Sequence, residues 1–508
     1  MFIKRLLLEM SAFFAAVVFS CLLVSCSAGD DYYGFPGAGY FGSWEPDLET
    51  DYFSGDKFDT IIDNPFVLTS EENVSTFSLD ADSASYSYMR KSINTGFLPD
   101  ESSVRIEEYL NYFTYDYEDP KGNETVALNS EVSSCPWNDE HYLVRLGIKG
   151  KSIEAENVPL NNYVFLIDVS GSMNGSDRLP LLKKCLIKML DSMNPNDRVS
   201  IVTYSGHEEL LLESTLVENK NLIKSKINSL TANGATNGAR AINMAYREAL
   251  DNYIEGGNNR IIMGTDGDFN VGITSTDALL ELVENYARQE KSVYLTVCGF
   301  GYGNLNDAMM EKVSNSGNGT YVYVDSENEM NKVFVEESSR FITVANDCKA
   351  QITFNKDLVY MYRLIGYENR VLANEDFEND KTDAAEIGAG QTVTALYEIV
   401  PCENCSYDPE SKEFAESLFT FDFRYKEKLN EESKLLSCTQ NKFSETCSEN
   451  MRFAQAVAAF GMVLRKSEYK GSCSLNLVTE LLGNGFTFDP SGRRCEFSEL
   501  VSRAFSCN

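Results

Sequence analysis

The stretch YVFLIDVSGS, residues 163–172, decides the fold of this chain. Its first five residues form an apolar run of the length of a buried strand, and polar residues follow at once. A helical pattern comes next through Leu182, Leu186 and Met189, and a second apolar segment, VSIVTYSG, begins at Val199. A strand, a helix and another strand in this order predict a βαβ unit with parallel strands.

The alternation of strand and helix patterns continues as far as residue 338. Further strands are expected in EELLLEST, RIIMGTDG, SVYLTVCGFG and TYVYVDS, the first of them at a sheet edge. Further helices are expected in NLIKSKINSL, ARAINMAYREALDNYI, STDALLELVENYARQEK, NDAMMEKVS and ENEMNKVFVEES. The pattern predicts an α/β fold with a doubly wound, mostly parallel sheet and helices on both faces. Ligands of such sheets bind at the carboxyl ends of the strands.

Five oxygen-bearing side chains follow the predicted strands at that edge. Asp168, Ser170 and Ser172 come directly after the first strand, where alternate residues of an extended loop point to the same side. Thr236, in NGATNG between two predicted helices, adds a third hydroxyl. Asp266, after the strand RIIMG, adds a second carboxylate. These side chains are the candidate ligands of one metal ion.

The ligand set is made of hard oxygens, without imidazole or thiolate, and this favours Mg²⁺, Mn²⁺ or Ca²⁺ over zinc or copper. Two carboxylates cancel the charge of one divalent ion within the site. Because near-octahedral Mg²⁺ takes six oxygens, at least one position stays open for an Asp or Glu of a partner. We therefore expect binding to a protein partner, with no catalytic residues.

A plainer interpretation of these residues is a capped loop whose hydroxyls bond the backbone, as Ser, Thr and Asp often do. Asp268 and Asn270 are interpreted as loop-forming residues behind the ligands. A metal with an open position can also activate water, so a metal-dependent hydrolase is an alternative. Only Glu208, Glu209 and Asp268 are arguable as its general base. A third alternative is a structural envelope lipoprotein in which the cation only stabilises the fold.

The pattern resembles the von Willebrand factor type A (VWA) family, whose metal-ion-dependent adhesion site is DxSxS, a later Thr and a later Asp. Asp168, Ser170 and Ser172 match DxSxS, Thr236 matches the second element, and Asp266 matches the third. The likeness implies a Rossmann-like domain that binds partners through a divalent cation.

A wider likeness runs from about residue 64 to residue 505. This part of the chain is similar to a bacterial family of exported proteins in which N-terminal and C-terminal domains flank the VWA domain. The segments that carry it include TFSLDADSASYSYMRKSINTGFLP, TDGDFNVG, YRLIGYENR, GAGQTVTALYEIVP and RFAQAVAAFGMVLRKSEYKG. One departure is GATNG, where relatives tend to have a longer glycine run.

The flanks differ from the α/β region in their patterns. Before it, Asp82 and Ser83 are expected to cap a helix, and helical periodicity surrounds Tyr109. After residue 343, extended runs predict β-structure. Two helices are expected after it, in RFAQAVAAFGMVLRKS and SLNLVTELLG. We expect HYLVRLGIKG to pack with the later extended runs, so that the VWA domain is an insertion in a β-rich body. Three domains are expected. Residues 61–160 form a small α+β region, residues 161–342 form the VWA domain, and residues 343–508 form a β-rich domain with terminal helices.

The first 26 residues predict export. Lys4 and Arg5 precede an apolar run that ends in Leu23-Val24-Ser25-Cys26, similar to a bacterial lipobox. We expect a signal peptide at 1–25, lipidation of Cys26, and a tether at 26–60 to the cell envelope. Ser27 after the lipidated cysteine favours the outer membrane over the inner. An ordinary cleaved signal or an uncleaved anchor is the alternative.

The composition of the chain further restricts the kinds of partner and metal site that are expected. The 508 residues carry a formal charge of −33, which argues against nucleic acid as the main partner because its phosphates would be repelled. Thirteen cysteines but only two histidines make a zinc site at Cys402 and Cys405 improbable. Cys185 and Cys298 lie in apolar patterns and are expected to be buried free thiols.

Overall fold

The computed structural model describes residues 55–79, 82–205, 207–234, 239–267, 276–303, 305–380 and 384–507. The predicted signal peptide and Cys26 lie outside the described residues, as does nearly all of the tether. Thr236, Asp268 and Asn270 also lie outside them.

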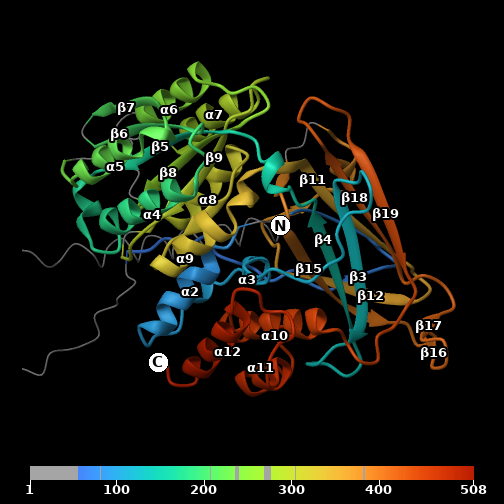
Figure 1. Ribbon diagram of the computed structural model, residues 1–508. Coiled ribbons are helices and arrows are strands. Elements are labelled where there is room, and N and C mark those ends of the chain that lie inside the picture. The colour runs from blue at the N-terminus through green and yellow to red at the C-terminus, as the bar shows by residue number, and fades with distance from the viewer. Residues whose placement is uncertain are drawn as a thin grey trace, which may run out of the picture. The chain divides into compact units, whose positions relative to one another are not determined.

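A six-stranded sheet forms the centre of the α/β region (Figure 1). Neighbouring strands are parallel except at the last edge, where β7 runs antiparallel to β6. The strands, in spatial order, are β10 (Tyr321–Tyr323), β9 (Tyr294–Gly299), β8 (Asn258–Thr265), β5 (Asn161–Asp168), β6 (Arg198–Tyr204) and β7 (Glu208–Leu216). The sheet confirms the predicted doubly wound topology, including the edge position of EELLLEST.

Helices cover both faces of this sheet. Phe165 and Ile167 of β5 belong to one core cluster, and Val164 and Leu166 belong to another, because successive side chains of a strand point to opposite faces. Burial on both faces explains why β5 is apolar without alternation. The helices are α4 (Leu179–Ser192), α5 (Lys220–Ser229), α6 (Ala239–Asp251), α7 (Thr276–Ala287), α8 (Asp307–Ser316) and α9 (Glu327–Asn331), which continues as a π-turn (Lys332–Glu336).

Two antiparallel sheets share a separate core in the flanking body. The first has the order β1 (Val67–Leu68), β12 (Val359–Ile365), β15 (Thr392–Pro401), β4 (Tyr142–Gly150) and β3 (Val126–Ser134). The second has the order β13 (Val371–Leu372), β2 (Val74–Ser78), β11 (Thr343–Phe354), β18 (Phe419–Lys426) and β19 (Lys434–Gln440), with β14 (Ala385–Gly388) on β11. A short hairpin joins β16 (Tyr407–Asp408) to β17 (Glu413–Phe414).

The sheets of the body are assembled from chain on both sides of the α/β region. β4, which precedes that region, pairs along its length with β15, which follows it, and Leu146 lies opposite Ala395. In the other sheet, β2 pairs with β11. The pairing confirms that HYLVRLGIKG packs with the later extended runs and that the α/β region is an insertion.

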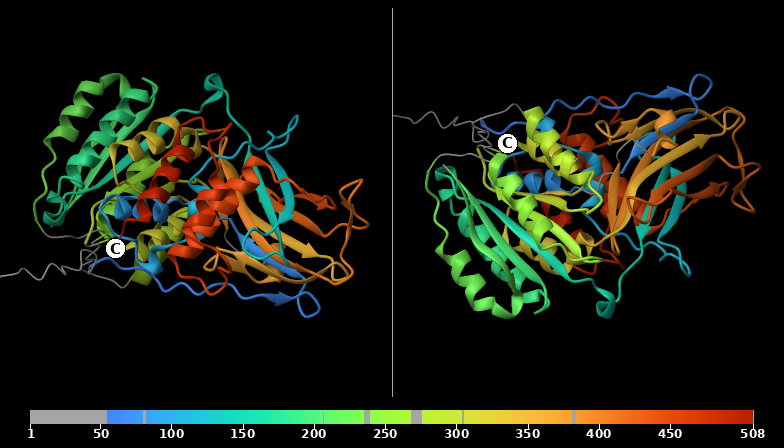
Figure 2. Two further views of the ribbon diagram at one scale, coloured as in Figure 1. Left: turned by 90° about the horizontal axis from the view of Figure 1, so that it is seen from below. Right: turned by 90° about the horizontal axis from the view of Figure 1, so that it is seen from above.

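Five helices form another core beside these sheets, and Figure 2 shows the first and last of them side by side. They are α2 (Ala84–Asn94), α3 (Ile106–Asn111), α10 (Glu449–Leu464), α11 (Leu475–Leu482) and α12 (Arg493–Ala504). The sequence predicted only two closing helices, so α12 was missed. Its buried residues 497, 500, 501 and 504 do follow helical spacing, but charged and polar residues separate them.

The start of α2 differs from the predicted cap. Ser83 is the N-cap residue, but its side chain makes no capping hydrogen bond. Asp82 instead accepts a hydrogen bond from the backbone N–H of Tyr321 at 2.7 Å and lies 3.4 Å from Arg370. Long-range contacts have therefore taken the place of the local cap.

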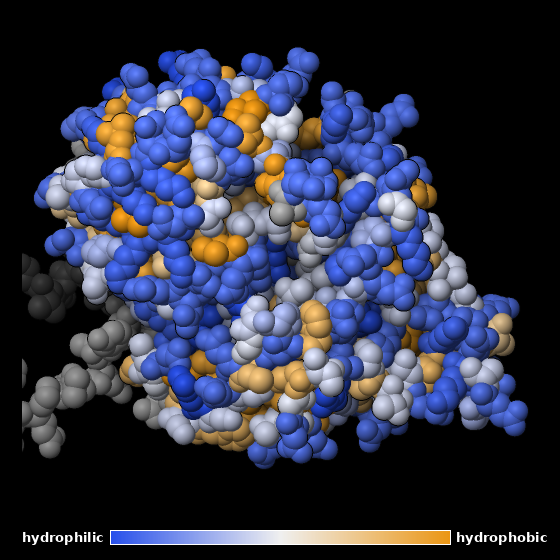
Figure 3. All heavy atoms as spheres, in the orientation of Figure 1, coloured by the Kyte–Doolittle hydropathy of each residue, from blue (hydrophilic) through white to orange (hydrophobic). Residues whose placement is uncertain are grey.

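The face shown in Figure 3 is mostly hydrophilic, with its hydrophobic side chains scattered over it. Within the described ranges, no helix is long and apolar enough to cross a bilayer. Cys185 and Cys298 are both fully buried and unbridged, as expected from their apolar patterns.

Candidate metal centre

The two predicted carboxylates lie at the carboxyl ends of adjacent parallel strands. Asp168 ends β5, and Asp266 directly follows β8, whose Gly264 pairs with Ile167. Thr265, the last residue of β8, donates its hydroxyl proton to Asp168 Oδ2 at 3.0 Å. The fold therefore brings Asp168 and Asp266 to one edge of the sheet, as the sequence predicted.

The loop after β5 presents its hydroxyls beside Asp168. The backbone N–H of Ser170 donates to Asp168 Oδ1 at 2.9 Å, which holds the start of the loop against the carboxylate. A short 3-10 turn, η4 (Gly171–Asn174), then brings the hydroxyls of Ser170 and Ser172 to 2.9 Å from each other. Three of the predicted ligands thus lie together in one short loop.

The segment that precedes Thr236 lies along the same loop. Gly171 donates its backbone N–H to the carbonyl of Gly234 at 3.1 Å, and Asn233 donates to the carbonyl of Val169 at 2.7 Å. These bonds align chain from between α5 and α6 with the loop that carries Ser170 and Ser172. The position of Thr236 itself lies outside the described residues.

Both carboxylates are removed from solvent, with Asp168 0% and Asp266 1% exposed. Burial, with a smaller contribution from the charge of Asp266, raises the pKa of Asp168 to about 6, although hydrogen bonds from Ser170 oppose the rise. Two buried carboxylates at the carboxyl ends of adjacent strands give the site a negative electrostatic potential. A divalent cation is the natural counter-charge for such a pair.

Arg178 supplies a positive charge at the rim of the site. Its Nη1 lies 3.3 Å from Asp266 Oδ2 and donates to the carbonyl of Ser172 at 2.5 Å. Its Nη2 donates to the carbonyl of Tyr302 at 2.7 Å. Gly301, at φ +82°, leaves room for this guanidinium, because a Cβ there would lie 2.2 Å from its Nε. Arg178 therefore ties together three loops of the site.

The rim continues into the N-terminal helix α2. Lys91 pairs with Asp177 at 2.8 Å, and its Nζ lies 3.9 Å from the centre of the Tyr302 ring. The hydroxyl of Tyr302 donates to the backbone carbonyl of Tyr88 at 3.3 Å. The loop that Arg178 holds is thus packed directly against the flanking region.

Sequence reasoning missed two residues of this site. Thr265 directly precedes Asp266 in the sequence, and this adjacency to a candidate ligand could have marked it as a residue of the site. Arg178 follows Ser172 by six positions, and no spacing rule marked it. Of the residues weighed as general bases, Glu208 pairs with Tyr204 and Glu209 pairs with Thr203 on the edge strand.

The residues present fit a divalent cation of the Mg²⁺ class. Asp168 and Asp266 provide charge, and the hydroxyls of Ser170 and Ser172 provide neutral oxygens, the donors that such ions prefer. When bound, the ion would supply Lewis-acid attraction for an acidic group of a partner. Over the described part of the chain, no cluster of three or more His, Cys, Asp and Glu side chains is arranged to hold a metal ion.

Three family models cover most of the chain. Residues 52–145 match the model described as von Willebrand factor, and residues 162–336 match von Willebrand factor type A domain. Residues 339–506 match the model described as Uncharacterized protein YfbK, C-terminal. The matches confirm a VWA domain between two flanking regions.

A relative that matches over most of its own length decides the family. The protein described as Uncharacterized protein YfbK of Escherichia coli (strain K12) is 38% identical over 461 residues, which cover 87% of this chain and 80% of the relative. The chain belongs to the YfbK family. VWA domains, which this family contains, mediate protein–protein interaction or adhesion in general.

More distant relatives are similar to only a part of this YfbK-family chain. Inter-alpha-trypsin inhibitor heavy chain H4 of Bos taurus is 30% identical over 38% of this chain and 24% of its own length. Heavy chain H3 of Homo sapiens is 29% identical over 47% of this chain and 28% of its own length. The chain therefore spans about a quarter of these heavy chains.

Among solved structures, von Willebrand factor type A from Catenulispora acidiphila matches with a TM-score of 0.42 at 14% identity, over 77% of this chain and 91% of that chain. The ArnB paralog VWA2 from Sulfolobus acidocaldarius matches with a TM-score of 0.38 at 14% identity, over 75% of this chain and 93% of that chain.

Proposed function

We propose that this YfbK-family chain is an envelope-anchored binding protein that captures an acidic group of a protein partner through one divalent cation. Asp168, Ser170, Ser172, Thr236 and Asp266 would hold the cation. The observation that carries the proposal is the meeting of two buried carboxylates and two hydroxyls, the hydroxyls 2.9 Å apart, at the carboxyl edge of the sheet. Mg²⁺ is the expected ion, with Mn²⁺ and Ca²⁺ as substitutes.

A binding role agrees better with the surroundings than a catalytic one. A hydrolase needs a general base within hydrogen-bond reach of the attacked water. Glu208 and Glu209 lie on the edge strand β7, which β6 separates from β5 and Asp168. Asp268, the third residue weighed as a base, lies outside the described residues. Arg178, 3.3 Å from Asp266, is no general base either, because a guanidinium stays protonated.

Lipid attachment through Cys26 would hold the protein in the cell envelope, and Ser27 favours the outer membrane. Metabolic labelling with palmitate tests this part separately from the metal site. We expect incorporation in the full chain and none in a Cys26→Ser variant. Equal labelling of the two proteins would contradict the anchor.

Calorimetry with Mg²⁺ and Mn²⁺ tests the cation site directly. We expect one site per chain, lost in Asp168→Ala. The matched control is Asp191→Ala, which removes an exposed carboxylate of α4 that pairs with Lys224. A full-length chain that binds neither cation would refute the site.

A pull-down from envelope extracts, with and without EDTA, tests partner capture. Capture should require the cation and should disappear with Asp168→Ala but not with Asp191→Ala. Cation binding without cation-dependent capture would instead support the structural alternative, in which the ion only stabilises the fold. Capture that resists both EDTA and Asp168→Ala would refute metal-mediated recognition.

A further inference from the structure

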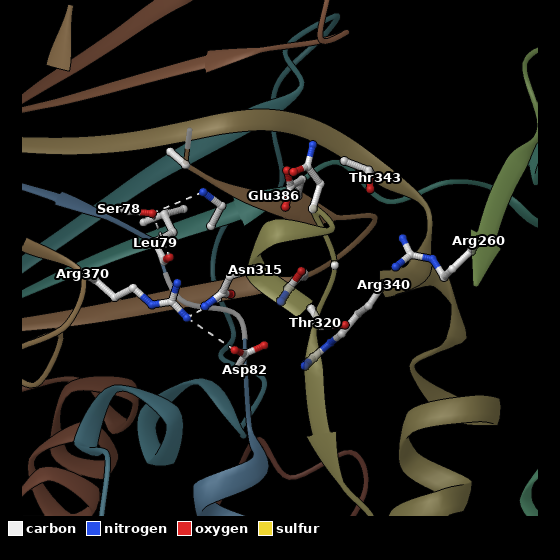
Figure 4. Close-up of a pocket in the computed structure, with 15 residues that line it drawn as sticks. Ser78, Leu79, Asp82, Arg260, Asn315, Thr320, Arg340, Thr343, Arg370 and Glu386 are labelled. Carbon is white, nitrogen blue, oxygen red and sulfur yellow. Dashed lines mark hydrogen bonds and ion pairs between the residues drawn. The ribbon is translucent and has the colours of Figure 1, made fainter. Parts of the chain in front are cut away.

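A polar cavity of about 110 Å³ lies where the N-terminal region, the α/β domain and the C-terminal region meet (Figure 4). Cavities at such junctions are common places for small ligands. Three arginines line it: Arg260 and Arg340 from the α/β domain and Arg370 from the C-terminal region. In Figure 4, Arg260 and Arg370 reach into it from opposite sides.

Arg370 and Arg340 have carboxylate partners. Arg370 lies 3.4 Å from Asp82 and 3.5 Å from Glu311. Arg340 lies 3.2 Å from Glu337. The positive charges of these two arginines are therefore matched within the protein.

Arg260 differs from them. It is only 3% exposed, yet no ion pair among the described residues includes it. Its two terminal nitrogens donate to the Thr296 hydroxyl at 2.8 Å and to the Phe341 carbonyl at 2.9 Å, but its buried Nε has no acceptor in the described part of the chain. The rings of Tyr294 and Phe341, 4.9 and 5.4 Å from the guanidinium carbon, stabilise the cation only in part.

Burial lowers the pKa of Arg260, but a guanidinium stays protonated in proteins. A buried guanidinium with no carboxylate at ion-pair distance is destabilising, so an anion beside it in the cavity would offset its charge. Glu386 on the cavity wall contributes favourable charge without reaching ion-pair distance from Arg260. The cavity holds several water-sized groups, which is enough for a small anion.

We propose that this cavity binds a small oxyanion, a carboxylate or a phosphate, with Arg260 as the anchor and the Thr320 hydroxyl as a second donor. All three regions contribute walls to the cavity. A ligand that binds only the folded chain therefore stabilises their junction. The site is separate from the candidate cation site, and its ligand is tested in the presence of EDTA.

Thermal unfolding and calorimetry of the full chain test the site with sodium acetate and sodium phosphate as probes, against sodium chloride at equal ionic strength. A saturable rise in Tm and a measurable Kd are expected for one of the two oxyanions. The probe that binds identifies the ligand class. If neither probe binds beyond the chloride baseline, the cavity holds only water and the proposal is wrong.

Arg260→Met removes the charge and the Nε donor, and should weaken binding by roughly tenfold or more, as expected for a hydrogen bond to a charged group. Arg288→Met, which removes an exposed arginine of the same domain, should leave Kd unchanged. If Arg260→Met does not fold, Ala385→Met decides, since it narrows the cavity without altering its charge. Unchanged affinity in the folded variant would overturn the proposal.

Discussion

At the scale of single residues, the candidate metal centre holds negative charge that the folded chain carries at a cost. Asp168 is fully buried near Asp266, and its raised pKa, about 6, expresses that cost. A carboxyl whose pKa is higher in the folded state than in the unfolded state stabilises the fold at low pH and loses that contribution as the pH rises through the folded pKa. At pH 8, the cation-free protein therefore has ionised Asp168 as a source of instability.

We expect Asp168→Asn to raise the thermal stability of the cation-free protein at pH 8 by on the order of 2 kcal/mol, while abolishing Mg²⁺ binding. An asparagine can keep both contacts, with its amide oxygen accepting from the Ser170 N–H and its amide nitrogen donating to the Thr265 hydroxyl. Differential scanning calorimetry in EDTA measures the first effect and titration calorimetry the second. Asp191→Asn is the control, and a lower Tm for Asp168→Asn would contradict the account.

Arg178 would compete with the proposed cation for Asp266. We expect Arg178→Gln to tighten Mg²⁺ binding by roughly tenfold, equivalent to about 1.4 kcal/mol, because the guanidinium 3.3 Å from Asp266 no longer offsets its charge. Arg178→Lys should stay near the wild-type Kd, and Arg288→Gln provides the charge-matched control. Weaker binding in Arg178→Gln would mean that Arg178 acts mainly by positioning Ser172.

At the scale of elements, the sequence predicted what depends on local pattern. The apolar run of β5 is buried on both faces, and the DxSxS loop follows it directly, so the pattern alone located the sheet and the loop that carries three of the candidate ligands. The contact of Arg178 with Asp266 was not predictable, because it depends on loops that only the folded sheet brings together. The helix starts where Asp82 and Ser83 predicted, but Ser83 makes no side-chain capping bond, and the carboxylate of Asp82 accepts from the backbone of Tyr321, which is distant in the sequence.

The missed helix α12 supports the helical core. Phe497 is fully buried, and its ring lies 5.4 to 5.9 Å from those of Phe113, Phe453 and Phe460. We expect Phe497→Ala to lower the free energy of unfolding by about 3–5 kcal/mol. Phe505→Ala, at the end of the same helix and 52% exposed, should change it little. Urea unfolding measures both, and equal effects would show that α12 does not support the core.

At the scale of the whole molecule, buried ion pairs join the inserted α/β domain to the N-terminal helices. Arg90 of α2 pairs with Asp325 at 2.5 Å and with Glu329 at 2.8 Å, and all three side chains are at most 4% exposed. Burial alone would raise the pKa of Glu329, but Arg90 and Lys332 hold it below its usual range. The pairing is therefore stabilising at neutral pH.

Because the pKa of Glu329 is depressed, its contribution is present above its unfolded-state pKa, about 4.3, and is lost as the pH falls through the folded value. We expect Glu329→Gln to destabilise the chain at pH 7 by about 3 kcal/mol and to make its loss of stability below pH 5 shallower. Tm measured from pH 7 to pH 3 tests this, with the exposed Glu284→Gln as control. Parallel curves for Glu329→Gln and wild type would exclude the role.

The pairing of β4 with β15 also has a consequence for proteolysis. The α/β domain is joined to the body by two covalent connections, one after β4 and one before β11. The first includes Val158 and Leu160, which are 42% and 38% exposed and accessible to a protease. One cut there leaves both fragments held by the strand pairs that cross the insertion. Release of the α/β domain from the body would take two cleavages, so a single nick leaves that domain in place.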